Sequence, residues 1–327
     1  MTCKIMLTGH PLAGDALDLA ASLGATLVPT ATYASENELA ALMRSEQPDA
    51  IIMRGGKITR DMIAACTRLK IIAKHGVGYD GIDIQAAAQR GIPVTITLGA
   101  NAQSVAEHAF ALMFAVARQI ALTHSRVQAN DWAGAKAASQ GMELFGKTLG
   151  LVGMGAIGGI LMDLVAPLRM RVKVYDPFLK VLPDGPHVER ETDFARLLQE
   201  ADIISLHCPL TEATRNLFGP EQFAHMRQGS VLINTARGEL IDADALAHAL
   251  RGGRLAGAGL DTVHPEPLAA DSPLRGLPNL IVTPHIGANT AEAKAKVGLM
   301  AVQQVVDALQ GKAPDPRCVV NRHLFEA

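Results

Sequence analysis

Alternating periodicity constrains the fold of this chain more than any other feature of its sequence. Short apolar or β-branched runs, such as CKIMLTG and DAIIMRG, alternate almost throughout with longer segments in which apolar residues have helical spacing. Strands that are joined by crossover helices pair in parallel. The pattern therefore predicts an α/β protein built from doubly wound parallel sheets.

The apolar runs fall into two series. Five predicted strands precede residue 100: CKIMLTG, ATLVPT, DAIIMRG, KIIAKHG and PVTIT. Six more follow Lys147: TLGLVGM, RVKVYD, ADIISLHC, GSVLINTA, LAGAGLD and LIVTPH. At roughly 100–200 residues per domain, a chain of 327 residues suits two domains with one sheet each.

Two predicted helices decide the domain boundaries. A long apolar helix opens at Ser104 and continues through SVAEHAFALMFAVARQIAL, which leaves little polar face. A last helix, TAEAKAKVGLMAVQQVVDAL, is closed by Gly311 and Pro314. If this last helix packs on the first sheet, the first domain is discontinuous. The predicted domains are then residues 1–100 with 288–327, and residues 101–287.

Composition excludes several classes of partner. With 30 Lys+Arg against 32 Asp+Glu, the chain has no basic field for nucleic acid, and an aromatic content of 4% disfavours base stacking. No run approaches the ~18 apolar residues of a membrane span. The four cysteines lie far apart without a CxxC pair, which predicts reduced thiols. We expect a cytoplasmic protein with a small-molecule partner and without metal, nucleic acid or membrane.

A glycine-rich turn follows the strand TLGLV. Gly153, Gly155 and Gly158 permit, in turn, a tight bend, the approach of backbone N–H groups to a pyrophosphate, and packing of the next helix on the strand. Asp176 ends the following strand, 176 − 158 = 18 residues on, where its carboxylate can accept hydrogen bonds from an adenine ribose. A packing turn and an Asp-Pro turn are the alternatives. Because a carboxylate repels a 2′-phosphate, NAD is predicted over NADP.

Three further residues suit hydride chemistry, which needs a base for the hydroxyl proton and a cation for the substrate. Arg237 and His285 each follow a predicted strand, at the edge where open α/β sheets bind ligands. Glu266 could orient an imidazole and raise its pKa above the ordinary ~6.5. A surface arginine, an exposed loop glutamate and His264 as a rival histidine remain the alternatives.

The motifs resemble, in order and over nearly the whole chain, those of the D-isomer-specific 2-hydroxyacid dehydrogenases, which include phosphoglycerate dehydrogenases and glyoxylate/hydroxypyruvate reductases. They are KHGVGYDGID, NAQSVAEHAFALMFAVAR, GLVGMGAIG, SLHCPLT, LINTARGELID, GLDTVHPEPL and TPHIG. The resemblance implies a flavodoxin-like substrate domain and a Rossmann NAD-binding domain. It also implies a short form without a regulatory module, and a homodimer formed through an arm near residues 119–147, where Trp132 suits an interface anchor or local packing.

The same resemblance implies hydride transfer between NAD(H) and a D-2-hydroxy or 2-keto acid, with a role for each residue. Arg237 would bind the substrate carboxylate and carbonyl, and Glu266 would pair with the acid/base His285. The expected cofactor-binding residues are Ser104, Gly153, Gly155, Ala156, Ile157, Gly158, Asp176, His207, Pro209, Thr214, Thr235, Ala236, Asp261 and Gly287. The expected substrate contacts are Arg54, Gly55, Val77, Gly78, Arg237 and His285.

Two stretches near the substrate depart from the commonest forms of the family: Arg54-Gly55-Gly56-Lys57, and Lys74-His75 before Gly76. The basic side chains among them could accept a second anionic group or could simply solvate loops; they are Arg54, Lys57, Lys74 and His75. An NAD-sensing protein like the C-terminal-binding corepressors and a phosphite-type dehydrogenase are the competing functions. Formate dehydrogenases have Gln in place of the acid, and Glu266 argues against them.

Overall fold

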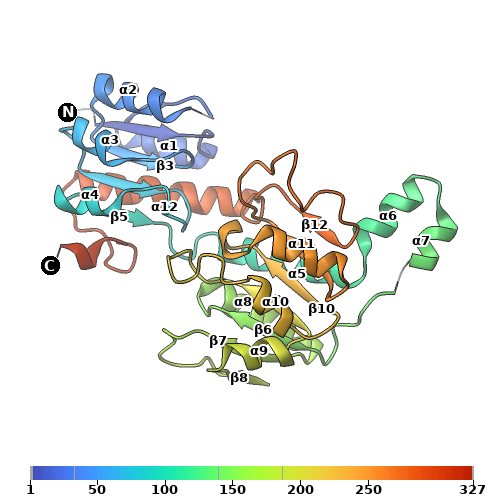
Figure 1. The fold of residues 1–327 in the computed structure, drawn as a ribbon. Coiled ribbons are helices and arrows are strands. Elements are labelled where there is room, and N and C mark those ends of the chain that lie inside the picture. Colours follow the sequence, from blue (N-terminus) through green and yellow to red (C-terminus); the bar gives the residue numbers. More distant parts are fainter. Residues whose placement is uncertain (1–2, 33, 139, 186, 326–327) are drawn as a thin grey trace. The chain divides into compact units, whose positions relative to one another are not determined.

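The computed structural model describes residues 3–32, 34–138, 140–185 and 187–325. The chain divides into two compact units (Figure 1). The first unit consists of Met1–Asn101 with Asn289–Ala327, and the second of Ala102–Ala288. Each unit has its own parallel sheet.

The first unit contains a five-stranded parallel sheet. Its strands are β1 (Lys4–Thr8), β2 (Thr26–Pro29), β3 (Ala50–Met53), β4 (Ile71–Lys74) and β5 (Val94–Ile96). Their order is β2-β1-β3-β4-β5, so all five predicted strands are present in the flavodoxin-like order. All four residues of β3 are buried, which explains its continuous apolar run.

Helices cover both faces of this sheet. They are α1 (Gly14–Ser22), α2 (Glu36–Glu46), α3 (Arg60–Ala65), α4 (Ile84–Gln89) and α12 (Ala291–Leu309), with a short 3₁₀ turn at η3 (Arg322–Leu324). Helix α12 starts where Thr290 Oγ1 accepts from the Ala293 N–H, and it packs on α1, β3 and β4. Gly298 permits this packing, because a Cβ there would lie 2.9 Å from Ala16 Cβ. The last helix therefore does pack on the first sheet.

The second unit contains a seven-stranded parallel sheet. Its strands are β6 (Thr148–Val152), β7 (Arg171–Tyr175), β8 (Val188–Arg190), β9 (Ile203–Leu206), β10 (Ser230–Asn234), β11 (Leu255–Leu260) and β12 (Leu280–Val282). The order β12-β11-β10-β9-β6-β7-β8 is the Rossmann order with one added strand. The prediction of six strands was wrong by one, because β8 is a three-residue edge strand with a single apolar side chain, Val188.

The helices of this unit are α5 (Ala102–Ala117), α6 (Ile120–Gln128), α7 (Trp132–Ala138), α8 (Ala156–Val165), α9 (Phe194–Glu200), α10 (Pro220–His225) and α11 (Ala243–Arg251), with 3₁₀ turns η1 (Ala166–Leu168) and η2 (Gly238–Leu240). The prediction of one long helix from Ser104 was wrong. Gln119 adopts the left-handed φ of 53°, so α5 ends and α6 leaves at 62°. Within the described residues no single helix is long and apolar enough to cross a membrane; α5 and α6 pass that test only as a bent pair.

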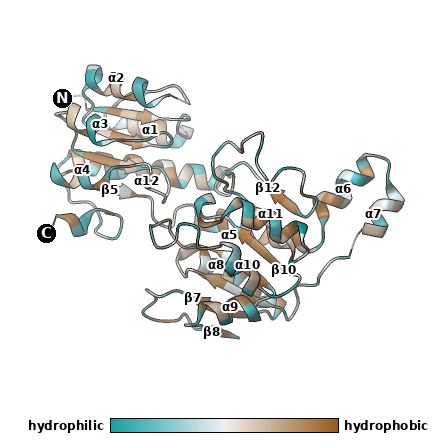
Figure 2. Ribbon diagram, viewed as in Figure 1, coloured by the Kyte–Doolittle hydropathy of each residue, from teal (hydrophilic) through white to brown (hydrophobic). Residues whose placement is uncertain are grey.

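Apolar side chains fill both faces of each sheet, and the strands are accordingly brown in Figure 2 while most helices carry both colours. Helix α5 packs on β11 because two glycines there leave room for it. A Cβ on Gly257 would lie 2.7 Å from Val116 Cγ1, and one on Gly259 would lie 3.2 Å from Leu112 Cβ. The sequence LAGAGL is thus a strand shaped for close helix packing.

Candidate active site

The glycine-rich turn joins β6 to α8 at the point where the strand order reverses. Gly153 has a φ of 95°, and a Cβ on it would lie 2.7 Å from the backbone nitrogen of Cys208. A Cβ on Gly158 would lie 2.9 Å from the Gly153 carbonyl oxygen. By contrast, a Cβ on Gly155 would meet nothing within 4 Å. The first and third glycines are therefore needed for packing, and the second leaves the mouth of the turn open.

The start of α8 is suited to an anion. Gly155 is the N-cap of α8, and among the described residues no side chain makes a capping hydrogen bond there. The positive end of the helix dipole and the first-turn N–H groups are therefore available to an anion; these include the N–H groups of Ala156 and Ile157. Asp176, after β7, accepts from the N–H of Met154 at 2.9 Å and of Phe178 at 2.9 Å. It therefore makes an Asp-Pro turn, and each of its oxygens keeps a second lone pair for a ribose hydroxyl.

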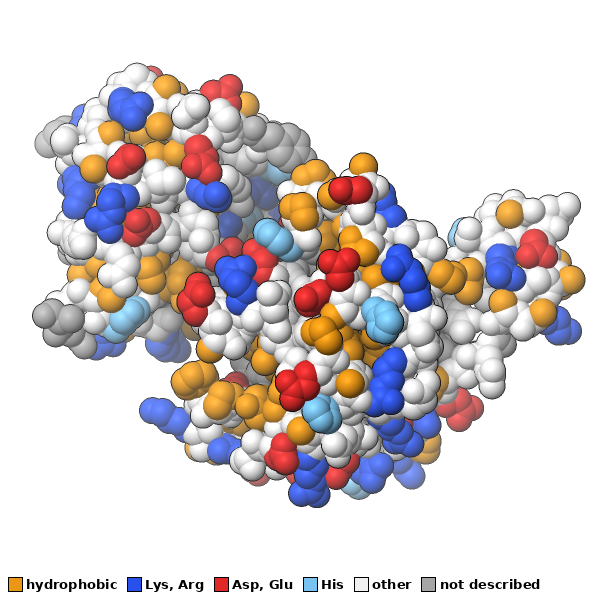
Figure 3. Space-filling view, viewed as in Figure 1, with side chains coloured by type: hydrophobic (Ala, Val, Ile, Leu, Met, Phe, Trp, Pro, Cys, Tyr) orange, Lys and Arg blue, Asp and Glu red, His pale blue; other side chains and the backbone are white. Residues whose placement is uncertain are grey.

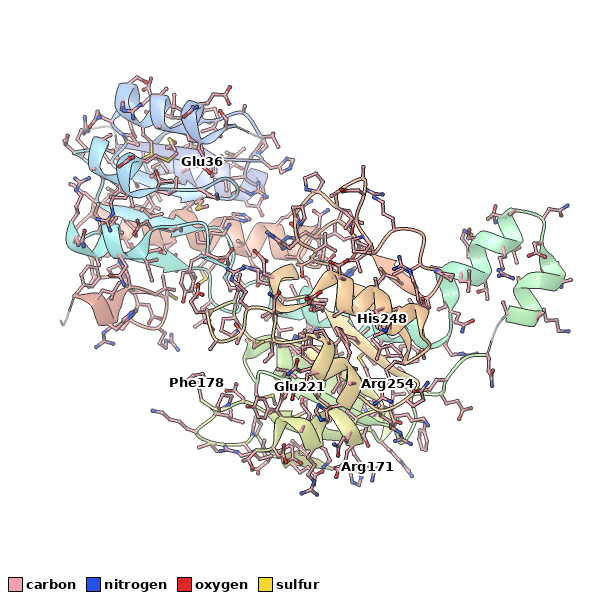
Figure 4. The ribbon with its side chains drawn as sticks, in the orientation of Figure 1. Glu36, Arg171, Phe178, Glu221, His248 and Arg254 are labelled. Atoms are coloured by element: carbon pink, nitrogen blue, oxygen red, sulfur yellow. The ribbon has the colours of Figure 1, made fainter. Side chains whose placement is uncertain are left out.

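Phe178 lies in the loop after β7, where Figure 4 labels it, and is 90% exposed. On the other side of the switch point, the His207 ring follows β9. Its Nε2 lies 2.9 Å from Ser205 Oγ, and burial lowers its pKa to about 4. Thr214 Oγ1 donates to the Pro209 carbonyl at 2.7 Å and accepts from the Thr211 N–H at 2.7 Å, which closes the loop after β9.

Arg237 is held by a residue that the sequence analysis missed. Asn234, fully buried at the end of β10, accepts from the Ala236 N–H at 2.9 Å and donates to the Arg237 carbonyl at 2.7 Å. The Arg237 guanidinium donates in turn to the Ala236 carbonyl at 2.7 Å. An Asn directly after the apolar run Val231–Ile233 was the signal that could have revealed this role.

Gly238 brings the Arg237 turn against the loop that carries Glu266. A Cβ on Gly238 would lie 2.1 Å from the carbonyl carbon of Val263 and 2.5 Å from the backbone nitrogen of His264. No side chain can occupy that space. The close approach of the two backbones thus depends on this glycine, which the sequence analysis did not single out.

His285 and Glu266 form a pair, with Nδ1 and Oε2 3.0 Å apart. Burial raises the pKa of Glu266, but the hydrogen bond from His285, the Val263 N–H and the charge of Arg237 outweigh it and lower the pKa overall. An ionised carboxylate fixes the proton on Nδ1 and leaves Nε2 for other chemistry. The rival His264 lies 3.5 Å from Glu239 instead.

Asp261 fixes the turn in which His285 stands. Its carboxylate accepts from Thr283 Oγ1 at 2.5 Å and from the N–H groups of Ile286 at 2.9 Å and Gly287 at 2.8 Å. Burial raises the pKa of Asp261, yet these bonds and one from His108 lower it to about 2. His285 itself has a left-handed φ of 56°, so its position depends on this support.

Four of the expected substrate contacts lie in the first unit: Arg54, Gly55, Val77 and Gly78. The N–H groups of Val77 and Gly78 have no acceptor in the part of the chain that the structure describes. Gly55, after β3, accepts from Thr8 Oγ1 at 2.7 Å. Arg54 Nη1 donates to the carbonyls of His10, at 2.8 Å, and Pro11, so it also holds the loop after β1.

The basic cluster differs from the predicted one. Lys57 pairs with Glu36 at 3.1 Å, and Lys74 Nζ donates to the Arg54 carbonyl at 3.0 Å. Burial, with the charges of Arg54 and Lys74, lowers the pKa of His75 to about 3. A cavity of about 440 Å³ is lined instead by His10, Pro11, Leu12, Ala13, Arg54, His75, Asn289 and Lys294. Lys294 and His10 lie far from Arg54 in the sequence, so no local sequence pattern could have predicted that they line the same cavity.

Comparison with known proteins identifies the family. The family model described as the NAD binding domain of the D-isomer specific 2-hydroxyacid dehydrogenases matches residues 110–287, more than half of the chain. The chain belongs to this family.

Two of the expected cofactor-binding residues lie elsewhere in the second unit. Ser104 lies in the first turn of α5, and Thr235 is buried beside the Arg237 turn.

The relatives to which the chain is similar are named as different enzymes of the family. The chain is 38% identical to a D-3-phosphoglycerate dehydrogenase of Methanocaldococcus jannaschii over 94% of this chain and 58% of that protein. It is 40% identical to a hydroxypyruvate reductase of Thermotoga maritima, over 84% and 89% of the two chains. An NAD⁺-bound 3-phosphoglycerate dehydrogenase structure from Entamoeba histolytica has a TM-score of 0.82 at 28% identity, over 98% and 99% of the chains. The chain thus spans less than two thirds of the phosphoglycerate dehydrogenase from M. jannaschii.

The residues present fit the cofactor of this 2-hydroxyacid dehydrogenase family. Thr235 Oγ1 and His207 Nδ1 are buried polar atoms without a hydrogen-bond partner among the described residues. Buried polar atoms of this kind ordinarily have partners, so both are available to a bound molecule. Together with the open Gly155 and the uncapped α8, they form a set of donors and acceptors around the switch point.

Proposed function

We propose that this chain is an NAD-dependent dehydrogenase that interconverts a D-2-hydroxy acid and its 2-keto acid. The observation that carries the proposal is the pair of His285 and Glu266, 3.0 Å apart, with the charge of Arg237 acting on the same carboxylate. Proton transfer at a hydroxyl next to a carboxylate needs an oriented imidazole and a guanidinium. The names of the relatives support the same chemistry.

NAD is the proposed cofactor. The first turn of α8 and the open side of Gly155 would receive the pyrophosphate, Asp176 the adenine ribose, and Thr235 and Ala236 the nicotinamide ribose. Pro209 would flank the adenine. The carboxylate of Asp176 supports NAD over NADP because it would repel a 2′-phosphate. When bound, NADH supplies the hydride.

In the direction of reduction, His285 donates a proton from Nε2 to the substrate carbonyl oxygen, since Nδ1 is engaged by Glu266. The ionised Glu266 stabilises the imidazolium before that transfer. Arg237 binds the substrate carboxylate and steadies the developing oxyanion. In the direction of oxidation the neutral His285 accepts the hydroxyl proton.

In the first unit, the N–H groups of Val77 and Gly78 are proposed to bind the substrate carboxylate, and Arg54 and Gly55 to bind the rest of the substrate. We propose that this rest of the substrate includes a second anionic group, bound in the 440 Å³ cavity by Arg54 and Lys294. His75, with a pKa of about 3, would serve there as a neutral hydrogen-bonding group. Lys57 and Lys74 have other partners and are left out of this site.

A homodimer is proposed through the arm formed by α6 and α7. No residue of α6 is buried, Ile120 is 52% exposed and Trp132 is 73% exposed. Figures 1 and 3 show the arm extending from its own unit with hydrophobic side chains on the visible surface. Exposed apolar surface of this kind marks interaction sites. Ser139 in the predicted arm lies outside the described residues. The four free cysteines support a reducing compartment such as the cytoplasm.

The test is NADH oxidation, followed at 340 nm, against glyoxylate, pyruvate, hydroxypyruvate, phosphohydroxypyruvate and oxaloacetate, with NADPH in parallel. We expect turnover with NADH and a preference for a dianionic substrate that Lys294→Ala abolishes. Activity on monoanions alone would overturn the second-anion site. Absence of turnover with intact NADH binding would overturn the proposed 2-keto acid reductase activity and favour the corepressor-like or phosphite-type alternatives, which the triad alone does not separate.

A further inference from the structure

A partly buried histidine that the proposed mechanism does not use contacts the residues around His285. His108, on α5, has its Nε2 3.0 Å from Thr283 Oγ1 and 3.3 Å from Asp261 Oδ1. Its side chain is 20% exposed, and that of Asp261 is 2% exposed. Three segments far apart in the sequence, a helix and the ends of β11 and β12, thus meet through these three side chains.

The directions of these hydrogen bonds follow from chemistry. Asp261, whose pKa is about 2, is ionised at neutral pH and can only accept. Thr283 has one hydroxyl hydrogen, and at 2.5 Å it donates that hydrogen to Asp261 Oδ1. Oγ1 therefore presents a lone pair to His108. The histidine must accordingly carry its hydrogen on Nε2, where it donates to both oxygens.

The group held by this network is the turn of the proposed acid/base. Asp261 accepts from the N–H groups of Ile286 and Gly287, and its backbone carbonyl accepts from the His285 N–H at 2.8 Å. The left-handed backbone of His285 is unfavourable for any residue other than glycine, so the turn persists only while its surroundings impose it. A small rotation there would take Nδ1 away from Glu266.

We propose that His108 is a positioning residue: its Nε2–H holds Thr283 and Asp261, and through them the turn that aligns His285 with Glu266. The inference rests on the proposed function of His285 and adds a residue to it. Because misplacement of a reacting group acts on the chemical step more than on binding, loss of this donor should lower kcat and leave KM little changed.

The variants are His108→Gln, which keeps an N–H donor near the position of Nε2, and His108→Phe, which keeps the shape of the ring without the donor. His248→Phe, an exposed position on α11 labelled in Figure 4, is the control. We expect His108→Phe to lower kcat at least tenfold, with KM and the Kd for NADH within threefold. His108→Gln should stay within threefold of the wild type. Equal activity of all variants, or equal loss in Gln and Phe, would overturn the proposal.

Nitrogen-15 NMR of the histidine rings tests the inference without turnover. We expect His108 to be protonated on Nε2, and the Nδ1 resonance of His285 to change in His108→Phe but not in His108→Gln. A hydrogen on Nδ1 of His108, or an unchanged His285 resonance, would overturn it. The proposed function itself fails separately, if the wild type turns over no 2-keto acid or if His285→Gln remains active.

Discussion

Gly238→Ala should separate the two loops that carry the proposed catalytic groups. The new Cβ would lie 2.1 Å from the carbonyl carbon of Val263, whereas ordinary contact begins at 3.4 Å, so the loops must part by 3.4 − 2.1 = 1.3 Å. The Val263 N–H donates to Glu266, and Gly238 follows Arg237, so the shift falls between the carboxylate and the guanidinium. A misplacement of about 1 Å costs on the order of 10²-fold in rate.

Overpacking should also lower the free energy of unfolding by about 1–3 kcal/mol. The assays are kcat/KM for NADH-dependent reduction of the preferred 2-keto acid and urea unfolding. Gly219→Ala is the matched control, because its Cβ would meet nothing closer than 3.5 Å. A Gly238→Ala enzyme with activity within threefold of the wild type and an unchanged unfolding midpoint would refute the reasoning.

Three other perturbations follow from the structure. His207 has a pKa of about 4 in the folded chain and an ordinary 6.5 in the unfolded chain, so the unfolded chain binds more protons below pH 6.5. The free energy of unfolding should therefore decrease as the pH is lowered, by about 2 kcal/mol at pH 5. In urea unfolding at several pH values, His207→Phe should weaken this pH dependence, and a pH dependence equal to that of the wild type would contradict the prediction. Asp176→Ala should raise the KM for NADH tenfold or more and reduce the preference of the enzyme for NADH over NADPH. An unaltered ratio of kcat/KM with NADH to kcat/KM with NADPH would exclude a role of Asp176 in cofactor selection. Trp132→Glu should convert a dimer to a monomer in light scattering, and a variant that stays dimeric would move the interface elsewhere.

The sequence predicted those parts of the fold in which local pattern and tertiary structure agree. Buried strands such as β3 are continuous apolar runs, and the glycine turn keeps its spacing because Gly153 and Gly158 each face a fixed backbone neighbour, whereas Gly155 faces open space. β8 was missed because an edge strand needs little burial. The break at Gln119 was missed because no glycine or proline marks it, and a left-handed glutamine is favoured only by its surroundings.

The positions of His285 and Arg237 could be predicted because each follows a strand, β12 and β10, and their catalytic roles stay predictions. The site was not predictable where the contact joins distant segments. Asn234 donates to the Arg237 carbonyl, and His108 lies within hydrogen-bond distance of Thr283. Lys57 was grouped with Arg54 by proximity in sequence, whereas its charge is paired with Glu36. Such pairings depend on the positions of the loops relative to one another, and the periodicity of apolar residues in the sequence does not predict these positions.

The central claim is that His285, paired with Glu266, transfers the proton. The most direct test is His285→Gln, with turnover measured at saturating substrate and NADH binding measured by calorimetry. General acid–base catalysis contributes about 10²- to 10⁴-fold, so kcat should fall by that factor while the Kd for NADH stays within threefold. A variant that keeps kcat within tenfold of the wild type, or one that no longer binds NADH, would contradict the account.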